Sequence, residues 1–128
     1  MRLLLDTHVL IWWLNDDAAL SAKARHAIAA PGSEVYVSSA SVWEIAVKQA
    51  LGKLEFPMDR MNGILDEVGF MALGIEIRHA IQAGALARHH DDPFDRMLIA
   101  HAVQEGLTIV TEDAMFRRYG VALIEGAG

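Results

Sequence analysis

The stretch RLLLDTHVLIWWLN, residues 2–15, decides the fold class. It begins with a short, continuous apolar run that predicts a buried strand at 2–6, and it continues after Asp6 with a segment at 7–15 that predicts a helix. Continuous apolar strands that alternate with helices are typical of a parallel sheet covered on both faces, so we expect an α/β fold. The same alternation recurs along the chain, with strands predicted at 34–38, within 69–75, at 107–111 and at 120–125, and helices at 21–30, 41–54, 59–68, 78–87 and 92–106.

The bulk composition narrows the class of protein. The chain has 128 residues, of which 53% are hydrophobic, and this predicts a single domain over 1–128 with a substantial core. It contains no cysteine, so a disulfide scaffold and any cysteine-based zinc or redox site are excluded. No apolar run approaches the roughly 20 residues that span a bilayer. No targeting segment follows Met1, so we expect a cytoplasmic protein without membrane contact.

The net charge of −6 is unlike that of a simple nucleic-acid-binding protein, which carries a basic patch. An acidic protein can still act on nucleic acid if bound cations supply the positive charge. An acidic pocket can also attract a basic segment of a partner.

Four acidic residues fall close to predicted junctions between strands and helices. Asp6 ends the first predicted strand, and Asp113 follows the fourth by two residues. Glu44 lies early in the helix after the second strand, and Asp95 lies at the start of the helix that precedes the fourth. Ligands of parallel α/β sheets bind beyond the carboxyl ends of the strands. We therefore expect these four side chains to share one site.

Each of the four also has a local explanation. Ser41 and Glu44 have the spacing of a capping box, with Glu44 at the third helical position. Asp92, Pro93 and Asp95 fit the N-cap, first and third positions of their helix. The other two aspartates can each cap the helix that follows. For any one residue alone, helix capping is the stronger hypothesis.

The set as a whole favours a cation site. Caps need only local contacts and have no reason to converge. Two carboxylates about 4 Å apart repel by about 4 kcal/mol at an effective dielectric of 20, and one or two divalent ions would remove that repulsion. Magnesium and manganese prefer carboxylate and water oxygens. The pattern therefore indicates metal-dependent hydrolysis of a phosphate ester.

Four segments carry a resemblance to a known family. With them the chain resembles the PIN-domain ribonucleases, and in particular the VapC toxins of bacterial type II toxin–antitoxin modules. The motifs DTH, SxWEIxxK and DPFDRxLIAxA are specific in combination, whereas residues 57–88 carry only generic similarity. In the family's order, the segments are LLLDTHVLIWWL at 3–14, VSSASVWEIAVKQALGKLEF at 37–56, HHDDPFDRMLIAHA at 89–102 and LTIVTEDAMFRRYGVALI at 107–124.

The resemblance implies a three-layer α/β/α PIN-like fold around a central parallel sheet of four to five strands. It implies an endoribonuclease that uses Mg²⁺ or Mn²⁺, with in-line attack of a metal-activated water on RNA and no protein nucleophile. The family's acidic positions fall on Asp6, Glu44, Asp95 and Asp113. The three aspartates would be the main metal ligands, and Glu44 would bind a second ion or position the water. The implied partners are an RNA substrate, a cognate antitoxin and a second copy in a homodimer.

Neighbouring residues are possible lining of the same site. Thr7 and Thr111 match small hydroxyl residues that line the family's site, and ordinary strand-end hydrogen bonding is an equal alternative. Arg96 could brace a site carboxylate or contact RNA phosphate, or it could form a surface salt bridge. Lys48 stands four residues after Glu44, a spacing that predicts a helical ion pair.

For several aromatic and basic residues, the sequence allows either a functional role or an ordinary structural or surface role. Trp12 and Trp13 point about 100° apart on a helix. One of them could be exposed for a contact with a protein partner, or both could be covered within the domain. Arg117 and Arg118, in the cluster FRRY, could touch RNA or lie in a surface loop.

The histidines are expected at the surface. A zinc site built from His89, His90, Asp91 and Asp92 is a minor alternative, because adjacent histidines seldom face the same way and no third ligand has suitable spacing. We expect both histidines and Asp91 to face solvent, and His8 to lie on a helix surface.

Two rival hypotheses accompany the ribonuclease. A receiver-like signalling domain also uses acidic strand ends and Mg²⁺. It needs an acidic pair after the first strand and a lysine after a late strand, whereas Asp6 precedes Thr7 and LTIVTED has no lysine. A catalytically inactive PIN-like binding scaffold would keep the fold without turnover.

Overall fold

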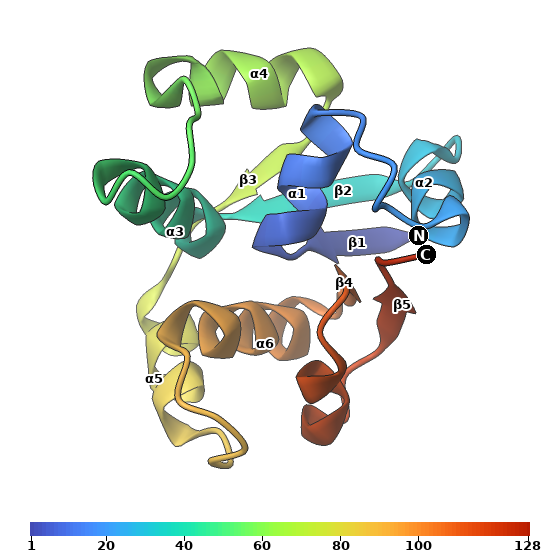
Figure 1. The fold of residues 1–128 in the computed structure, drawn as a ribbon. Coiled ribbons are helices and arrows are strands. Elements are labelled where there is room, and N and C mark those ends of the chain that lie inside the picture. Colours follow the sequence, from blue (N-terminus) through green and yellow to red (C-terminus); the bar gives the residue numbers. More distant parts are fainter.

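A five-stranded sheet runs through the centre of the molecule, which we describe from a computed structural model of residues 1–128 (Figure 1). Its strand order is β3-β2-β1-β4-β5, and all four strand pairs are parallel. This arrangement confirms the α/β fold with a parallel sheet. The strands are β1 (Arg2–Leu5), β2 (Glu34–Ser38), β3 (Met71–Leu73), β4 (Thr108–Thr111) and β5 (Leu123–Glu125).

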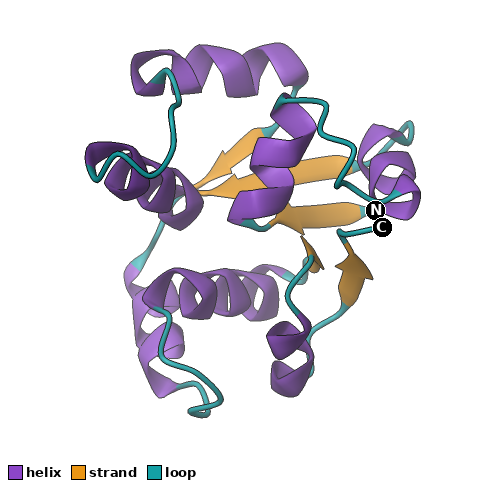
Figure 2. Ribbon diagram, in the orientation of Figure 1, coloured by secondary structure: helices purple, strands orange, loops and turns teal.

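Helices cover both faces of the sheet (Figure 2). On one face, α1, α2 and α4 pack on the sheet in a single apolar cluster; on the other, α6 and η2 form a second cluster. The α5 helix packs on α6, and α3 contacts both α1 and α6. The helices are α1 (Thr7–Leu14), α2 (Ala22–Ala29), α3 (Ser39–Ala50), α4 (Met61–Val68), α5 (Ile77–Ala85) and α6 (Pro93–Glu105), with 3₁₀ turns η1 (Met58–Arg60) and η2 (Ala114–Tyr119).

Successive side chains of a strand point to opposite sides of a sheet. The continuous apolar runs of the central strands therefore place apolar side chains on both faces. In β1, Leu3 and Leu5 belong to the first cluster and Leu4 to the second, and all three are fully buried. In β4, Ile109 belongs to the second cluster and Val110 to the first. A continuous apolar run is therefore the pattern that a strand covered on both faces requires.

The order of the strands reverses beside β1. The chain passes from β1 to β2 and β3 on one side, and it returns to place β4 on the other side of β1. In open α/β sheets such a reversal creates a crevice at the carboxyl ends of the two strands. Asp6 directly follows β1 and Asp113 follows β4 by two residues, so both lie at this crevice.

The start of α3 differs from the sequence prediction. We expected Ser41 as the cap and Glu44 at the third helical position. Instead the helix begins at Ser39, and Ser38 is the N-cap, with its Oγ accepting from a backbone amide two residues on at 2.9 Å. Ser41 is buried in the helix, and its Oγ has no hydrogen-bond partner. Glu44 is therefore the sixth residue of the helix and has no capping role.

Neither tryptophan of the WW pair stands free at the surface. Trp13 packs on Phe70 with ring centroids 6.1 Å apart, Trp12 stacks on His8, and both are half-buried against the first cluster. Of the two alternatives, the structure favours coverage within the domain, because both side chains pack against the first cluster. The exposed tryptophan is Trp43, at 59%.

The helices are short. The longest, α6, has 13 residues, and no helix has the length and apolar character that crossing a bilayer requires.

Candidate active site

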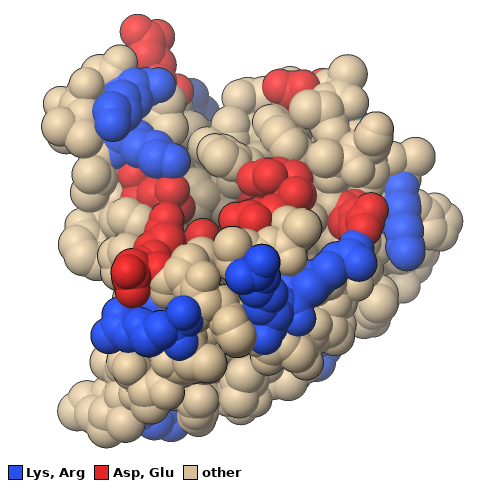
Figure 3. Space-filling model, turned by 60° about the horizontal axis from the view of Figure 1, so that its bottom comes forward, with Lys and Arg blue, Asp and Glu red and all other residues tan.

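The carboxyl ends of β1 and β4 border a cavity whose wall is wholly polar. It has a volume of about 200 Å³, and none of its nine lining residues is hydrophobic. Figure 3 shows acidic side chains gathered on one face of the molecule, with Lys and Arg side chains around them. All four acidic residues predicted from the sequence line the cavity, which is formed by Asp6, Thr7, His8, Glu44, Lys48, Asp92, Asp95, Glu112 and Asp113.

Asp6 is both a helix cap and a wall of the cavity. Its Oδ1 accepts from the Val9 amide at 3.0 Å and caps α1. Its Oδ2 accepts from the Thr111 hydroxyl, which comes from β4, at 2.5 Å. Asp6 is only 5% exposed, so these two contacts fix the carboxylate in a single orientation.

Asp113 has the same double character at the end of β4. Its Oδ1 accepts from the Met115 amide at 2.9 Å and caps η2. Its own amide donates to Thr111 Oγ1 at 3.1 Å, while that hydroxyl donates to Asp6. Thr111 therefore joins the two aspartates, and it contributes to the site through Asp6 and Asp113 and not by lining the cavity itself.

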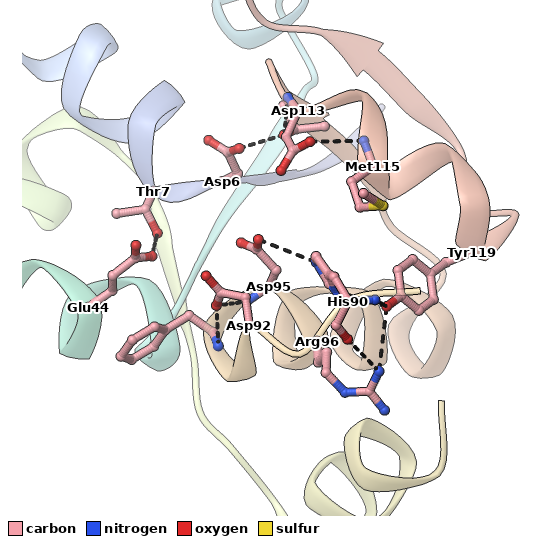
Figure 4. A network of polar contacts seen from close by, with 12 residues as sticks. Asp6, Thr7, Glu44, His90, Asp92, Asp95, Arg96, Asp113, Met115 and Tyr119 are labelled. Carbon is pink, nitrogen blue, oxygen red and sulfur yellow. Dashed lines mark hydrogen bonds and ion pairs between the residues drawn. The ribbon is translucent and has the colours of Figure 1, made fainter. Parts of the chain in front are cut away.

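Glu44 reaches the cavity from α3. Its Oε1 accepts from the Thr7 hydroxyl at 2.7 Å, and its Oε2 pairs with Lys48 Nζ at 2.8 Å. The predicted ion pair with Lys48 is confirmed. Because both oxygens have partners from different helices, the carboxylate is held toward the cavity (Figure 4).

Asp95 reaches the cavity from the first turn of α6. The capping of that helix belongs to Asp92, whose Oδ1 accepts from the amides of Phe94 and Asp95 at 2.9 and 3.1 Å, with Pro93 at the first position. The prediction that Asp92 caps this helix and that Pro93 begins it is confirmed. With the backbone capped by Asp92, the Asp95 side chain is left to face the other acids (Figure 4).

The electrostatics of the site reflect its crowding. Burial raises the pKa of Asp95 to about 8, and repulsion from Asp92, Asp6, Glu44 and Asp113 adds to the rise. Burial also raises the pKa of Asp6 to about 6, although the hydrogen bonds from Thr111 and Val9 oppose this. The site is therefore built at an electrostatic cost that a bound cation would remove.

Two further residues line the cavity at the same junctions: Glu112, which the sequence patterns did not single out, and His8, which was expected on a helix surface. Glu112 stands beside Asp113 and lines the cavity. Its Oε1 lies 2.9 Å from Nδ1 of His8. His8 is half-exposed, as expected for a helix surface, yet it also lines the cavity. Their place directly after Thr7 and Thr111, at the ends of the two strands, was the available clue.

Arg96 does not line the cavity, and the predictions of a carboxylate brace, a phosphate contact or a surface salt bridge are wrong. The side chain is 5% exposed, and its guanidinium also lies 3.4 Å from the Tyr119 hydroxyl. At 2.8–3.2 Å it donates to four carbonyl oxygens at the end of α5 and in the following loop, those of Ala83, Leu86, Ala87 and His90. It is a structural clamp for the chain that leads into α6.

The two histidines before α6 differ. His89 is exposed and Asp91 pairs at the surface with Arg88, as expected. The expectation that His90 faces solvent is wrong. Its side chain is 16% exposed, and it lies between Tyr119 and Asp95. Arg117 and Arg118 are exposed on η2 and do not line the cavity, so an RNA contact there stays a prediction.

The donor set fits a hard cation. No three His, Cys, Asp or Glu side chains of the chain converge tightly enough to form a ready-made metal-binding group, which leaves the zinc alternative without support. The carboxylates surround a space and do not meet at a point. Such a wall of oxygen donors suits a cation that keeps part of its water shell, as Mg²⁺ does.

The fold and the acidic crevice define a class of α/β protein, and a comparison with protein families identifies that class. The model described as PIN domain matches residues 3–122. The chain belongs to the PIN-domain family.

Individual relatives extend over nearly the whole chain. Ribonuclease VapC22 of Mycobacterium tuberculosis is 28% identical over 119 residues, which cover 91% of this chain and 90% of that protein. VapBC2 from Rickettsia felis, bound to a DNA fragment from the promoter, has a TM-score of 0.69 at 17% identity and covers 97% of this chain and 98% of that one. A toxin–antitoxin complex from Klebsiella pneumoniae has a TM-score of 0.67 at 18% identity, with 95% of both chains covered. At these identities the two structures show the likeness of the fold.

Proposed function

We propose that this protein is a Mg²⁺- or Mn²⁺-dependent endoribonuclease and the toxin component of a type II toxin–antitoxin system. One observation carries the proposal, which is that Asp6, Glu44, Asp95 and Asp113 come from four parts of the chain and line one wholly polar cavity. Membership of the PIN-domain family and the similarity to a protein named as a VapC ribonuclease support it.

Asp6, Asp95 and Asp113 would hold the cation directly or through water, and Glu44 would hold a second cation or orient water. When bound, the cation would supply Lewis-acid polarisation of the phosphodiester and lower the pKa of water. The chain's own contribution is to fix the carboxylates. Thr111 and the amides of Val9 and Met115 orient the first and third aspartates.

The cavity offers no free hydroxyl or thiol as a nucleophile. Its lining has no serine and no cysteine, and the one hydroxyl, that of Thr7, already donates to Glu44. Lys48 is the only Lys or Arg in the lining, and its side chain is 34% exposed, so it can meet an incoming phosphate. This composition supports direct hydrolysis without a covalent protein intermediate.

The proposed partners are an RNA substrate, a cognate antitoxin and a second copy of the chain. Several large apolar side chains are exposed on and near α5, including Ile77 at 81% and Ile81 at 68%. Apolar surface of this kind is typical of protein contacts. Similar folds occur in structures described as VapBC and toxin–antitoxin complexes, which supports an antitoxin partner. The homodimer stays a prediction.

The two rivals stand differently. A receiver domain has the strand order 2-1-3-4-5, whereas the order here is 3-2-1-4-5, so that alternative is wrong. An inactive PIN-like scaffold has the same fold as an active enzyme, and only a turnover measurement separates the two.

Asp95→Asn is the sharpest test, because the Asp95 side chain caps no helix and its loss leaves the backbone contacts in place. We expect Mn²⁺-dependent cleavage of RNA to fall at least about 100-fold, since loss of groups that only support metal ligands already costs about 10–100-fold. Asp6→Asn should likewise abolish cleavage. Circular dichroism and thermal unfolding in EDTA check that the fold is kept.

Asp91→Asn is the matched control, because Asp91 is an exposed carboxylate four residues away and pairs only with Arg88. It should cleave as the wild type does. Calorimetric titration with Mn²⁺ on the same variants separates a cation site from a set of caps. Wild-type cleavage by Asp95→Asn in EDTA would overturn the proposal. If the protein binds Mn²⁺ but cleaves no RNA in a total RNA pool, the result would support the inactive PIN-like scaffold and overturn the proposed activity.

A further inference from the structure

A chain of polar contacts leads from Arg96 to the edge of the acidic cavity (Figure 4). The Arg96 guanidinium lies 3.4 Å from the Tyr119 hydroxyl, and that hydroxyl lies 2.8 Å from Nδ1 of His90. The other ring nitrogen of His90, Nε2, lies 3.5 Å from Oδ2 of Asp95. Tyr119 ends η2 and Asp95 lies in the first turn of α6, so these contacts join the two elements.

The contacts of Tyr119 favour one tautomer of His90. The Tyr119 hydroxyl accepts from the His90 backbone amide at 3.3 Å and from Arg96. A phenol has two acceptor lone pairs and a single proton. Since these two donors approach the oxygen at 3.3 and 3.4 Å, the arrangement favours a hydroxyl proton that points to His90 Nδ1, at 2.8 Å, with that nitrogen as the acceptor. In the neutral ring the proton then lies on Nε2, the nitrogen that faces Asp95.

Nε2 of His90 has no other partner. It is buried and makes no hydrogen bond, since 3.5 Å is longer than a normal N–H···O bond. A buried donor without an acceptor is costly. A small movement of the Asp95 carboxylate toward the ring would satisfy it, and this movement would occupy one of the two carboxylate oxygens and leave the other for the cavity.

We propose that His90, fixed by Tyr119, is a positioning residue that orients the Asp95 carboxylate for cation binding. The inference rests on the proposed function, because it takes Asp95 as a ligand of the cation. Asp95 needs such help more than the other aspartates do. Asp6 and Asp113 are fixed by backbone amides that they cap, whereas no backbone amide holds the Asp95 side chain.

Two substitutions of His90 separate positioning from packing. In His90→Gln the amide nitrogen lies close to the position of Nε2 and can still donate to Asp95. In His90→Asn the shorter amide can still accept from Tyr119 but does not reach Asp95. We expect calorimetric titration with Mn²⁺ to show about tenfold weaker binding for His90→Asn, with most of the affinity restored in His90→Gln.

Tyr119→Phe tests the second link. It should weaken Mn²⁺ binding by a smaller factor, and the double variant with His90→Asn should bind no more weakly than His90→Asn alone, because Tyr119 acts through His90. Nitrogen-15 NMR of the imidazole should show the Nε2–H tautomer in the wild type and a mixture of tautomers in Tyr119→Phe. His89→Asn is the matched control, since His89 also packs on Tyr119, at 4.8 Å between ring centroids, but has no contact with Asp95.

The outcomes distinguish this inference from the proposed function. If Asp95→Asn binds Mn²⁺ as tightly as the wild type, the cation site itself is wrong. If Asp95→Asn loses binding while His90→Asn keeps wild-type affinity, only the role of His90 is wrong. Equal losses in His90→Asn and His90→Gln, or an Nδ1–H tautomer in the wild type, would also overturn it.

Discussion

At the scale of single residues, Gly126 shows how closely the chain packs behind the site. Its amide donates to the carbonyl oxygen of Thr111 at 2.8 Å. A Cβ at this position would lie 2.6 Å from Val9 Cγ2 and 3.2 Å from the carbonyl carbon of Thr111. Both neighbours also hold the carboxylate of Asp6, so any movement that relieves the clash would disturb that carboxylate.

Gly126→Ala should therefore lower the free energy of unfolding by about 1–3 kcal/mol, the usual cost of overpacking, and should weaken Mn²⁺ binding as well. Gly63→Ala is the matched control. Gly63 lies within α4 with no atom near its missing Cβ, so alanine there should stabilise the protein by about 0.5–1 kcal/mol. Urea unfolding measures both. Unchanged stability in Gly126→Ala would contradict the packing described here.

At the scale of elements, the connection between α5 and α6 depends on one side chain. Four carbonyl oxygens, at the end of α5 and in the following loop, accept from the buried guanidinium of Arg96. This loop also carries His90 and Asp92, so its shape determines how α6 begins and where Asp95 points. The motif DPFDR thus combines a cap, a site carboxylate and the clamp for the preceding loop.

Arg96→Lys should destabilise the protein by roughly 2–4 kcal/mol, because one ammonium cannot replace a planar group that bonds to several carbonyls, and charged hydrogen bonds are worth about 1.5–3 kcal/mol each. Amide hydrogen exchange of residues 86–92 should also accelerate. Arg88→Lys, at an exposed ion pair, should change stability by less than about 0.5 kcal/mol. Wild-type stability in Arg96→Lys would show that the clamp is dispensable.

The sequence predicts the elements better than their ends. All five strands lie within or close to the ranges that apolar runs indicate, because burial on both faces leaves a plain pattern. The start of α3 was misplaced because the chain offers three serines at 38, 39 and 41, and local chemistry alone does not choose among them. The end of strand β2 determines which serine is the cap. The strand runs to Ser38, and the helix begins at the next residue, so Ser38 is the N-cap.

The site was predictable where residues follow strands and was missed where contacts are distant. Asp6, Glu44, Asp95 and Asp113 were found from their places near predicted junctions between strands and helices, and the resemblance to the PIN-domain family pointed to the same four positions. The contact between His90 and Tyr119 joins residues 29 positions apart, and no periodicity in the sequence reports such a pair.

At the scale of the whole molecule, two buried groups give the metal-free protein opposite responses to pH. The pKa of Asp95 is raised to about 8, so the folded protein holds a proton that the unfolded chain releases, and stability falls as pH rises toward 8. Burial and the neighbouring His79 lower the pKa of His101 to about 4. The unfolded chain therefore binds that proton first, and stability falls as pH drops from about 6.5 to 4.

Thermal unfolding in EDTA should accordingly show a gain in stability as pH falls from 8.5 to 6.5, and this gain should vanish in Asp95→Asn. Below about pH 6.5 the requirement to keep His101 neutral opposes the further gain. We propose that residues 1–128 form one domain, so each scan should show a single cooperative transition. A wild-type profile that rises with pH between 6.5 and 8.5 would contradict the arrangement of charges at the site.

The pairing of β1 with β4 has a consequence for the time at which activity can appear during synthesis. Asp6 leaves the ribosome more than 100 residues before its partner Thr111 and the neighbouring Asp113. Chains emerge from the N-terminus at about 5–20 residues per second. Until the segment that forms β4 has emerged, the nascent chain contains three of its four site carboxylates but lacks the strand that completes the cavity. A ribosome that stalls or releases the chain before that point therefore yields a product without a complete site, and hydrolysis can begin only after the segment that carries Asp113 has been synthesised.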